Sequence, residues 1–538
     1  MTRGRGGRRH PRRQTTRGLG KRTAWFRFQW RGRALLDGVV TAWYYRGTLG
    51  PPTHQVTLPS SVPPMVRHST ALCALATLLL AGCGAPDAAP EAPAATAMEA
   101  RVDSIAQEAV ASGAVAGLSV GVLRGGDTLV LKGYGKADLE LDVPTPPNAL
   151  YEIASVTKQF TAAAILRLRD AGKLSLDDPI TTHLPWYPAT GAGITVARLL
   201  DHTSGIHSYT EVPAFGAMMA RRLPRDSLLR LFVNAPLDFP TGTMAVYNNS
   251  AYFLAGLVIE AASGQSYADY VRTALFEPAG MARSRYCSEE EVQPGKVKGY
   301  ATLPARPDSG RAAPVLRHKP FLTHAYPYAA GSLCATAGDL LAWNRALHTG
   351  RVLSAESYRA LVTPSTLVDG TALRYAKGLT LRRWGGHRLI AHGGGINGFS
   401  AFSSYFPDDS LAVVVLINST GRSSDAIAKA IALAILGTRE EAPVAFTGNL
   451  DALAGTYRGL ESFSGAARGK TVDVVVSVDS GRLMVASPAA PTPKVATYLG
   501  DDRWALDEHQ LRFTTGQRGA QLHLDRIYGY TILDKVAR

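Results

Sequence analysis

The spacing of apolar positions predicts a long helical middle in this chain. Val102, Ile105 and Ala109 recur at helical spacing. Because Gly113 follows them, we predict an amphipathic helix over 99–112. The same spacing, bounded by Ser, Thr or Gly caps, predicts further helices at 156–171, 250–263, 267–276, 338–348, 355–362 and about 424–436.

Extended apolar runs lie on both sides of this helical middle. "VAGLSVGVL" and "TLVLKGYG" are separated by a glycine-containing turn at 124–127, which predicts a hairpin. A second group of strands fills 377–418 and ends in the continuous apolar run "LAVVVLIN". The pattern predicts an α+β fold (an α/β sandwich), in which a central antiparallel sheet built from both chain ends is flanked by helices and carries a helical subdomain.

The pattern changes near residue 447. Short alternating runs such as "TVDVVVSV", "RLMVAS" and "QLRFTT" follow, with turn residues between them. This spacing predicts a small all-β barrel over 447–538. Because none of these runs gathers residues of catalytic type, we assign the barrel to packing or partner contact.

The positive charge of the chain is local. Of the formal net charge of +15, residues 1–64 supply +12 through thirteen Lys or Arg and one Asp. The remaining residues are therefore close to neutral, and no basic stripe with interleaved aromatic residues occurs among them. We expect no nucleic-acid binding.

Residues 65–82 have the features of an export signal. Arg67 follows Met65, and the apolar stretch at 71–81 is too short to span a bilayer as a mature helix. Small residues come next. We therefore expect an exported protein whose signal has its own start methionine.

The "LAGC" sequence at 80–83 resembles the lipobox of bacterial lipoproteins. On that resemblance Cys83 carries lipid and anchors the protein to the membrane of the bacterial cell envelope. The alternative is a processed secretory signal with an incidental cysteine. Residues 83–98, rich in Ala and Pro, would form a tether. Residues 1–64 would be an extension that is never made, or else a disordered basic arm.

Two cysteines remain in the mature body, Cys287 and Cys334. An oxidising envelope permits them to pair. The position of Cys334 beside a predicted helix start favours instead a buried small apolar side chain. Since neither CxxC nor HExxH occurs, we predict no metal site and no cofactor.

Two serines are candidate nucleophiles. Ser119 lies in "GLSVG", which fits G-x-S-x-G, but more strand follows it where a nucleophile elbow needs a helix. Ser155 opens the predicted helix of "ASVTKQFTAAAIL", and Lys158 lies one turn further on the same face. A lysine that burial leaves uncharged can take the serine proton. We therefore favour Ser155.

Further polar groups occur in two distant segments. Tyr247 and Asn249 precede a helix in "YNNSAYFLAG", where a phenol can move a proton and an amide can orient the lysine. His392 begins "HGGG" at the end of a predicted strand, and Gly394 and Gly395 would let a substrate lie against the strand edge. A backbone N–H there can complete an oxyanion hole.

Two other histidines have simpler interpretations. The H-x-G at His348–Gly350 is typical of a helix C-terminus. His202 and Ser204 in "DHTSGI" are also interpreted as a helix end.

SxxK, YxN and HxG in this order, with the flanks "LLDHTSGI" and "GGGINGFSAF", resemble the class C β-lactamase-like serine hydrolases. These belong to the β-lactamase and penicillin-binding-protein superfamily, with D-peptidase and esterase members. The resemblance covers about 100–436 and implies a hydrolase domain over 99–440. It implies Ser155 as acylated nucleophile, Lys158 as base, Tyr247 as proton shuttle, Asn249 as orienting amide and Gly395 as second oxyanion donor.

The chain departs from true β-lactamases at the strand motif. They carry K-T-G where this chain has His392, Gly393 and Gly394. Histidine is mostly neutral at pH 7, so the grip on a substrate carboxylate should be weaker. We expect a peptidase or esterase acting on a small-molecule or peptide acyl substrate, more than an efficient β-lactamase. The alternative is a binding protein that lost turnover.

Overall fold

The computed structural model describes residues 94–306, 310–460, 470–488, 490–507, 509–516 and 519–536. The predicted extension, the signal, Cys83 and most of the tether therefore lie outside the described residues. The first helix, α1 (Ala94–Ala111), begins five residues before the predicted start. In the described residues, no helix has the length and apolar character needed to cross a bilayer.

A seven-stranded antiparallel sheet forms the centre of the hydrolase body, in the order β10-β11-β12-β13-β1-β2-β3. As predicted, it joins strands from the two ends of this body, because β1 pairs with β13. Its strands are β1 (Gly117–Arg124), β2 (Asp127–Asp138), β3 (Val143–Pro144), β10 (Thr380–Trp384), β11 (His387–Ile396), β12 (Phe399–Phe406) and β13 (Leu411–Ile417).

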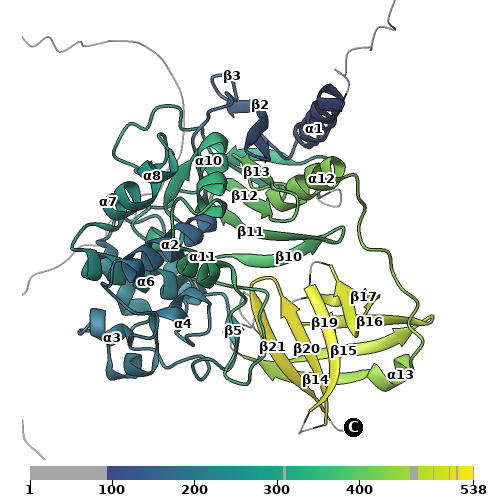
Figure 1. Ribbon diagram of the computed structural model, residues 1–538. Coiled ribbons are helices and arrows are strands. Elements are labelled where there is room, and N and C mark those ends of the chain that lie inside the picture. The colour runs from purple at the N-terminus through teal and green to yellow at the C-terminus, as the bar shows by residue number, and fades with distance from the viewer. Residues whose placement is uncertain are drawn as a thin grey trace, which may run out of the picture. The chain divides into compact units, whose positions relative to one another are not determined.

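Helices cover both faces of the sheet (Figure 1). On one face, α1 and α12 (Ser424–Leu436) pack on alternate residues of β13, namely Val413, Val415 and Ile417. The intervening residues, among them Val414, face the core that includes α10 (Ala337–His348). This alternation explains the continuous apolar run, since both faces of β13 are buried.

The helical subdomain is inserted between β3 and β10. Its longer helices are α2 (Thr157–Asp170), α6 (Asn249–Ser263) and α11 (Ala355–Val362). Shorter elements are α3 (Ile180–His183), α4 (Val196–Leu200), α5 (Pro213–Met218), α7 (Tyr267–Val271), α8 (Glu277–Ala279) and α9 (Tyr328–Gly331). The helix predicted over 267–276 changes to a π-helical turn at Arg272–Phe276.

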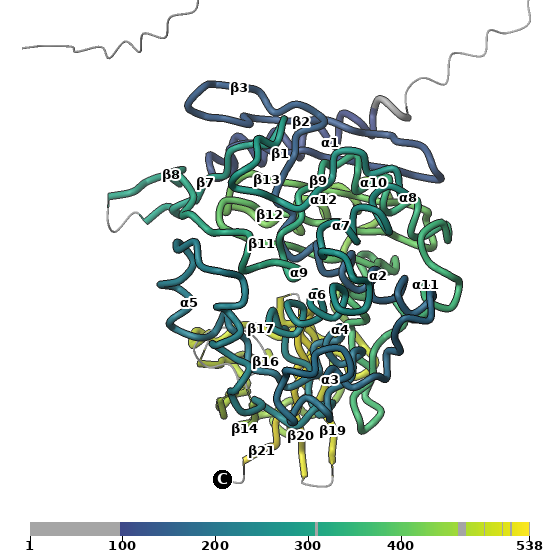
Figure 2. Tube along the Cα trace, turned by 90° about the vertical axis from the view of Figure 1, so that its left-hand side faces the viewer, coloured from purple at the N-terminus to yellow at the C-terminus, as the bar shows by residue number. Residues whose placement is uncertain are grey.

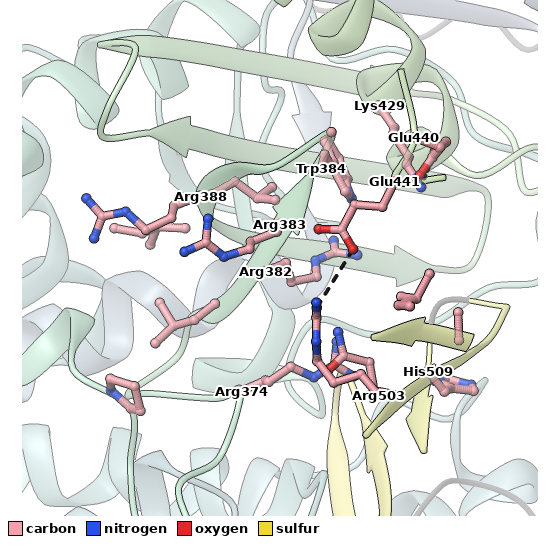
Figure 3. A pocket seen from close by; sticks show the side chains of 18 of the residues that line it. Arg374, Arg382, Arg383, Trp384, Arg388, Lys429, Glu440, Glu441, Arg503 and His509 are labelled. Atoms are coloured by element: carbon pink, nitrogen blue, oxygen red, sulfur yellow. Dashed lines mark ion pairs between the residues drawn. The ribbon is translucent and has the colours of Figure 1, made fainter. Parts of the chain in front are cut away.

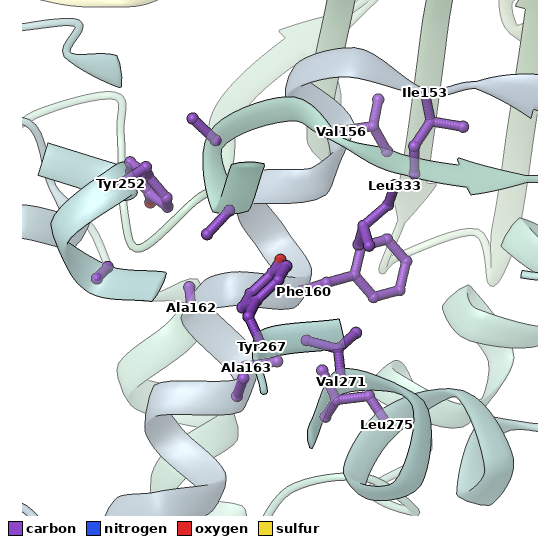
Figure 4. Close-up of a cluster of buried hydrophobic side chains, with 14 of the residues drawn as sticks. Ile153, Val156, Phe160, Ala162, Ala163, Tyr252, Tyr267, Val271, Leu275 and Leu333 are labelled. Atoms are coloured by element: carbon purple, nitrogen blue, oxygen red, sulfur yellow. The ribbon is translucent and has the colours of Figure 1, made fainter. Parts of the chain in front are cut away.

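Helix α2 is buried along most of its length, from Thr157 to Leu166 (Figure 4). Phe160 packs between Phe276, whose ring centroid is 5.5 Å away, and Trp343, at 4.3 Å. Each such buried large side chain stabilises the fold by about 1.5–3 kcal/mol. This packing fixes the first turn of α2, which carries Lys158.

Small strand pairs connect the subdomain to the body. Strand β4 (Tyr151–Glu152) pairs with β9 (Leu333–Ala335), which also pairs with β6 (Arg285–Tyr286). Strands β7 (Tyr300–Leu303) and β8 (Val315–His318) form a separate hairpin. Cys287 and Cys334 form a disulfide, so the buried free thiol that the sequence favoured for Cys334 is wrong. The β6–β9 pairing brings the two cysteines together, which chain position alone did not reveal.

The predicted C-terminal barrel is confirmed and closes through β14 and β21 (Figure 2). Its strands are β14 (Gly455–Leu460), β15 (Thr471–Asp479), β16 (Arg482–Ser487), β17 (Ala490–Gly500), β18 (Arg503–Leu506), β19 (His509–Gly516), β20 (Gly519–Arg526) and β21 (Gly529–Lys535), preceded by α13 (Leu450–Leu453). The body extends this sheet, because β5 (Ala245–Val246) pairs with β21.

A cavity of about 780 Å³ lies between β10 and β11 of the body and β18 and β19 of the barrel (Figure 3). Cationic side chains line it, and carboxylates neutralise most of them: Arg374 pairs with Asp525, Arg382 with Asp425, Arg388 with Asp408, Lys429 with Glu440, and Arg503 with Glu441. The Arg374–Asp525 pair joins the barrel to the segment that leads into β10.

Candidate active site

Ser155 lies in a strained turn between β4 and α2. The preceding residue, Ala154, has φ +47°, a left-handed conformation that costs a residue with a Cβ about 1–2 kcal/mol. The Ile153 N–H donates to the Leu333 carbonyl at 3.0 Å, which ties the turn to β9. From Tyr151 to Leu166 only Ser155 is not fully buried. The turn therefore presents one hydroxyl to the surface.

Lys158 is fully buried, and its Nζ lies 3.2 Å from the Ser155 Oγ. Burial lowers the pKa of Lys158 well below its ordinary value. Nζ also donates to the Asn249 Oδ1 at 2.9 Å and to the Ala330 carbonyl at 2.8 Å. An uncharged amine has two N–H groups and one lone pair. Since the two carbonyl oxygens take the N–H groups, the lone pair is left for the Ser155 hydroxyl.

Tyr247 and Asn249 reach this point from the start of α6. The Asn248 side chain caps α6 by accepting the Ala251 N–H at 2.9 Å, which fixes the first turn. The Lys158 Nζ lies 4.7 Å from the centroid of the Tyr247 ring. Lys158 thus contacts Ser155, Asn249 and Tyr247, three residues that the sequence placed in one site.

The glycine-lined edge of β11 passes beside the serine turn. Pairing between β10 and β11 stops at Thr380 and Ala391, so His392 begins an edge that β10 leaves open. A Cβ on Gly394 would lie 2.4 Å from the Ile153 carbonyl oxygen and 3.0 Å from the Ser155 nitrogen. A Cβ on Gly395 would meet nothing within 4 Å. Gly394 therefore contacts the turn, and Gly395 borders open space.

His392 is fully buried beside this edge. Its Nδ1 lies 2.6 Å from the Gly393 carbonyl, which only accepts, so Nδ1 carries the proton. The Tyr375 hydroxyl then donates to Nε2 at 3.0 Å. Burial and the nearby Lys158 lower the pKa of His392 to about 3. The residue that replaces the lysine of K-T-G is therefore a neutral, buried imidazole.

Other sequence candidates lie outside the site. Ser119 is fully buried in β1 and lies 3.0 Å from the Tyr151 hydroxyl, as a strand residue should. His348 ends α10, and Gly350 follows with φ +77°, as expected of a helix C-terminus. In the described part of the chain, no cluster of His, Cys, Asp or Glu could hold a metal ion.

The structure adds two residues that sequence reasoning missed. The His202 ring lies 4.5 Å from the Tyr247 ring, centroid to centroid, and its Nδ1 accepts the Asn248 N–H at 3.1 Å. The "DHTSGI" segment was a usable signal for His202. Tyr528, from the barrel, accepts the Gly393 N–H on its hydroxyl at 3.1 Å. No sequence signal marked it.

The fold and these contacts define a class of protein, built on an antiparallel sheet with a helical insert that brings a serine, a buried lysine, a tyrosine and a glycine-lined strand edge together. The chain belongs to the Beta-lactamase family, whose model matches residues 102–437.

Known relatives agree with this membership. The chain is 29% identical to the D-aminopeptidase of Gluconobacter oxydans over 343 residues, 63% of this chain and 62% of that protein, so it spans less than two thirds of that relative. A D-stereospecific amidohydrolase from Streptomyces sp. has 26% identity and a TM-score of 0.53, covering 63% of this chain and 99% of that chain. The octameric penicillin-binding protein homologue from Pyrococcus abyssi shares the fold at 24% identity and a TM-score of 0.54, over 82% of this chain and 100% of that chain.

Proposed function

We propose that this protein is a serine hydrolase that forms an acyl-enzyme on Ser155. The observation that carries the proposal is the buried Lys158 amine, whose lone pair is left for the Ser155 hydroxyl. A neutral base within hydrogen-bond reach of a hydroxyl is the arrangement that activates a serine.

In the proposed reaction, Lys158 takes the Ser155 proton while Oγ attacks the substrate carbonyl carbon. The N–H groups of Ser155 and Gly395 stabilise the oxyanion. The proton then passes through the Tyr247 hydroxyl to the leaving amine or alkoxide as its bond to the carbonyl breaks. Water releases the acyl group by the reverse sequence, and Asn249 keeps Lys158 oriented throughout.

We propose amides and short peptides of D-amino acids, or simple esters, as substrates. Two observations support this choice: relatives include a D-aminopeptidase and a D-stereospecific amidohydrolase, and His392 is neutral and buried. A β-lactam carries a carboxylate, which enzymes with a K-T-G motif bind through the positive charge of the lysine. His392 supplies no such charge. We therefore expect β-lactam hydrolysis to be weak. The competing hypothesis is a binding protein without turnover.

A fluorophosphonate probe tests the proposal. It should label the wild-type protein on Ser155 and leave Ser155→Ala unlabelled. The same substitution should lower kcat/KM for D-alanine amide by ~10⁴-fold, if the serine acts as a unit with Lys158. L-alanine amide and a chromogenic cephalosporin are the comparison substrates. An unlabelled wild type, or a Ser155→Ala variant with normal turnover, contradicts the assignment.

We also propose export and anchoring of the protein at the bacterial cell envelope through lipid on Cys83, supported by the lipobox-like sequence alone. Cys83→Ala should move the protein from the membrane to the soluble fraction. Membrane retention of that variant would contradict the anchor.

A further inference from the structure

The barrel sends one residue into the candidate active site. Tyr528 lies in the turn between β20 and β21, and its hydroxyl accepts the Gly393 N–H at 3.1 Å. Its backbone carbonyl accepts the Tyr247 N–H, also at 3.1 Å. The Tyr528 ring centroid lies 5.2 Å from that of Tyr247 and 5.4 Å from that of His392. Tyr528 therefore contacts both the glycine edge and the proposed proton shuttle.

The structure holds Tyr528 from both sides. On one side, the pairing of Gly529 with Val246 joins β21 to β5, directly before Tyr247. On the other, Asp525 pairs with Arg374, Nε to Oδ2 at 2.9 Å. Two independent attachments to the body fix this turn, so the position of Tyr528 follows from the way the barrel docks.

Tyr528 occupies room that exists because residue 393 is glycine. A Cβ on Gly393 would lie 3.0 Å from the Tyr528 Oη. The Tyr528 hydroxyl thus fills the space that a side chain at residue 393 would occupy, and it accepts the backbone N–H of Gly393. An extended substrate on this edge would need that N–H.

The leaving group must extend toward Tyr528. It has to meet Tyr247, the proposed proton donor, and Tyr247 packs against Tyr528 and His392. Along a strand, the N–H groups of residues 393 and 395 point to the same edge about 7 Å apart. If the scissile carbonyl accepts the Gly395 N–H, a substrate that runs antiparallel to β11 reaches Gly393 two residues later. The carbonyl of the second residue of the leaving group would then accept the Gly393 N–H.

We propose that Tyr528 determines specificity for the leaving group. By holding the Gly393 N–H and closing the strand edge, it restricts cleavage to substrates whose leaving group is ammonia, a small alcohol or a single amino acid. This inference rests on the proposed serine hydrolase function and adds to it the size of the leaving group.

The test uses one acyl group and three leaving groups in the full chain. D-alanine amide, D-alanyl-glycine and D-alanyl-glycyl-glycine release ammonia, one residue and two residues. The wild type should cleave the last at least tenfold less efficiently than the second, measured as kcat/KM. Tyr528→Ala should raise the ratio of kcat/KM for D-alanyl-glycyl-glycine to kcat/KM for D-alanyl-glycine about tenfold. Tyr528→Phe keeps the ring but frees the Gly393 N–H. Because one hydrogen bond contributes about 0.5–1.5 kcal/mol, this variant should raise the same ratio two- to tenfold.

Tyr530→Phe is the matched control, because Tyr530 lies on the same hairpin but its hydroxyl contacts His523. Its ratio should equal that of the wild type. Fluorophosphonate labelling of Ser155 in each variant separates the two proposals. An unlabelled wild type contradicts the hydrolase function. If the proteins are labelled but Tyr528→Ala and Tyr528→Phe have the same ratio as the wild type, the proposed role of Tyr528 is overturned. It is also overturned if the labelled proteins cleave none of the three substrates. If Tyr528→Ala does not fold, Tyr528→Phe alone decides.

Discussion

Adding one methyl group at Gly394 should separate the strand edge from Ser155, the proposed nucleophile. The new Cβ would lie 2.4 Å from the Ile153 carbonyl oxygen, whereas an ordinary carbon–oxygen contact is about 3.3 Å. The turn and the strand must therefore part by about 0.9 Å. A displacement of about 1 Å can cost ~10²-fold in rate, and overpacking costs about 1–3 kcal/mol of stability.

We expect Gly394→Ala to fold, to unfold at lower urea concentration, and to lose about 100-fold in kcat/KM for D-alanine amide. Fluorophosphonate labelling should slow in parallel, because it depends on the same proposed nucleophile and oxyanion site. Gly216→Ala is the control, since a Cβ there meets nothing within 4 Å. Wild-type kcat/KM in a cooperatively folded Gly394→Ala protein would refute the argument that this contact positions Ser155.

Three further outcomes are expected. Because burial lowers the pKa of Lys158 and only the neutral amine accepts the Ser155 proton, kcat/KM should rise with pH to a plateau reached well below the ordinary lysine pKa of 10.5; a half-maximum near that value would contradict a neutral lysine. His392 has a pKa of about 3 when folded against 6.5 ordinarily, so its contribution to stability is present above pH 6.5 and is lost as pH falls toward 3, by up to about 1.4 kcal/mol per pH unit; His392→Gln should make the acid slope of the unfolding free energy shallower. The Cys287–Cys334 disulfide spans 47 residues and should contribute about 4 kcal/mol; a reductant should lower the Tm of the wild type but not that of the double alanine variant.

Local rules predicted much of this fold. Helix α6 runs from its Asn248 cap to Gly264, which has φ +72°, and the alternating burial of β13 explains its apolar run. The pairing of Ser155 with Lys158 also follows from helix geometry, because residues three apart share a face. These features depend on residues that are close in the sequence.

The parts that the sequence did not reveal depend on distant contacts. The disulfide requires β6 and β9 to pair. Tyr528 enters the site because β21 pairs with β5, where Gly529 pairs with Val246, a residue 283 positions earlier in the chain. No motif marks Tyr528, because a single tyrosine in a barrel turn cannot be told from a residue of an ordinary hairpin turn. The left-handed φ of Ala154 was equally hidden, because the turn that contains it hydrogen-bonds through the Ile153 N–H to Leu333, which is distant in the sequence.

The position of β1 has a consequence for how the protein comes to be made. This strand sits between β2 and β13, and Leu118 faces Ile417 across the ladder. A nascent chain must therefore keep β1 without its second neighbour until almost three hundred further residues have been synthesised. Such non-local pairing slows folding and exposes apolar strand edges in the meantime. Chaperone dependence and slow maturation should accompany this architecture.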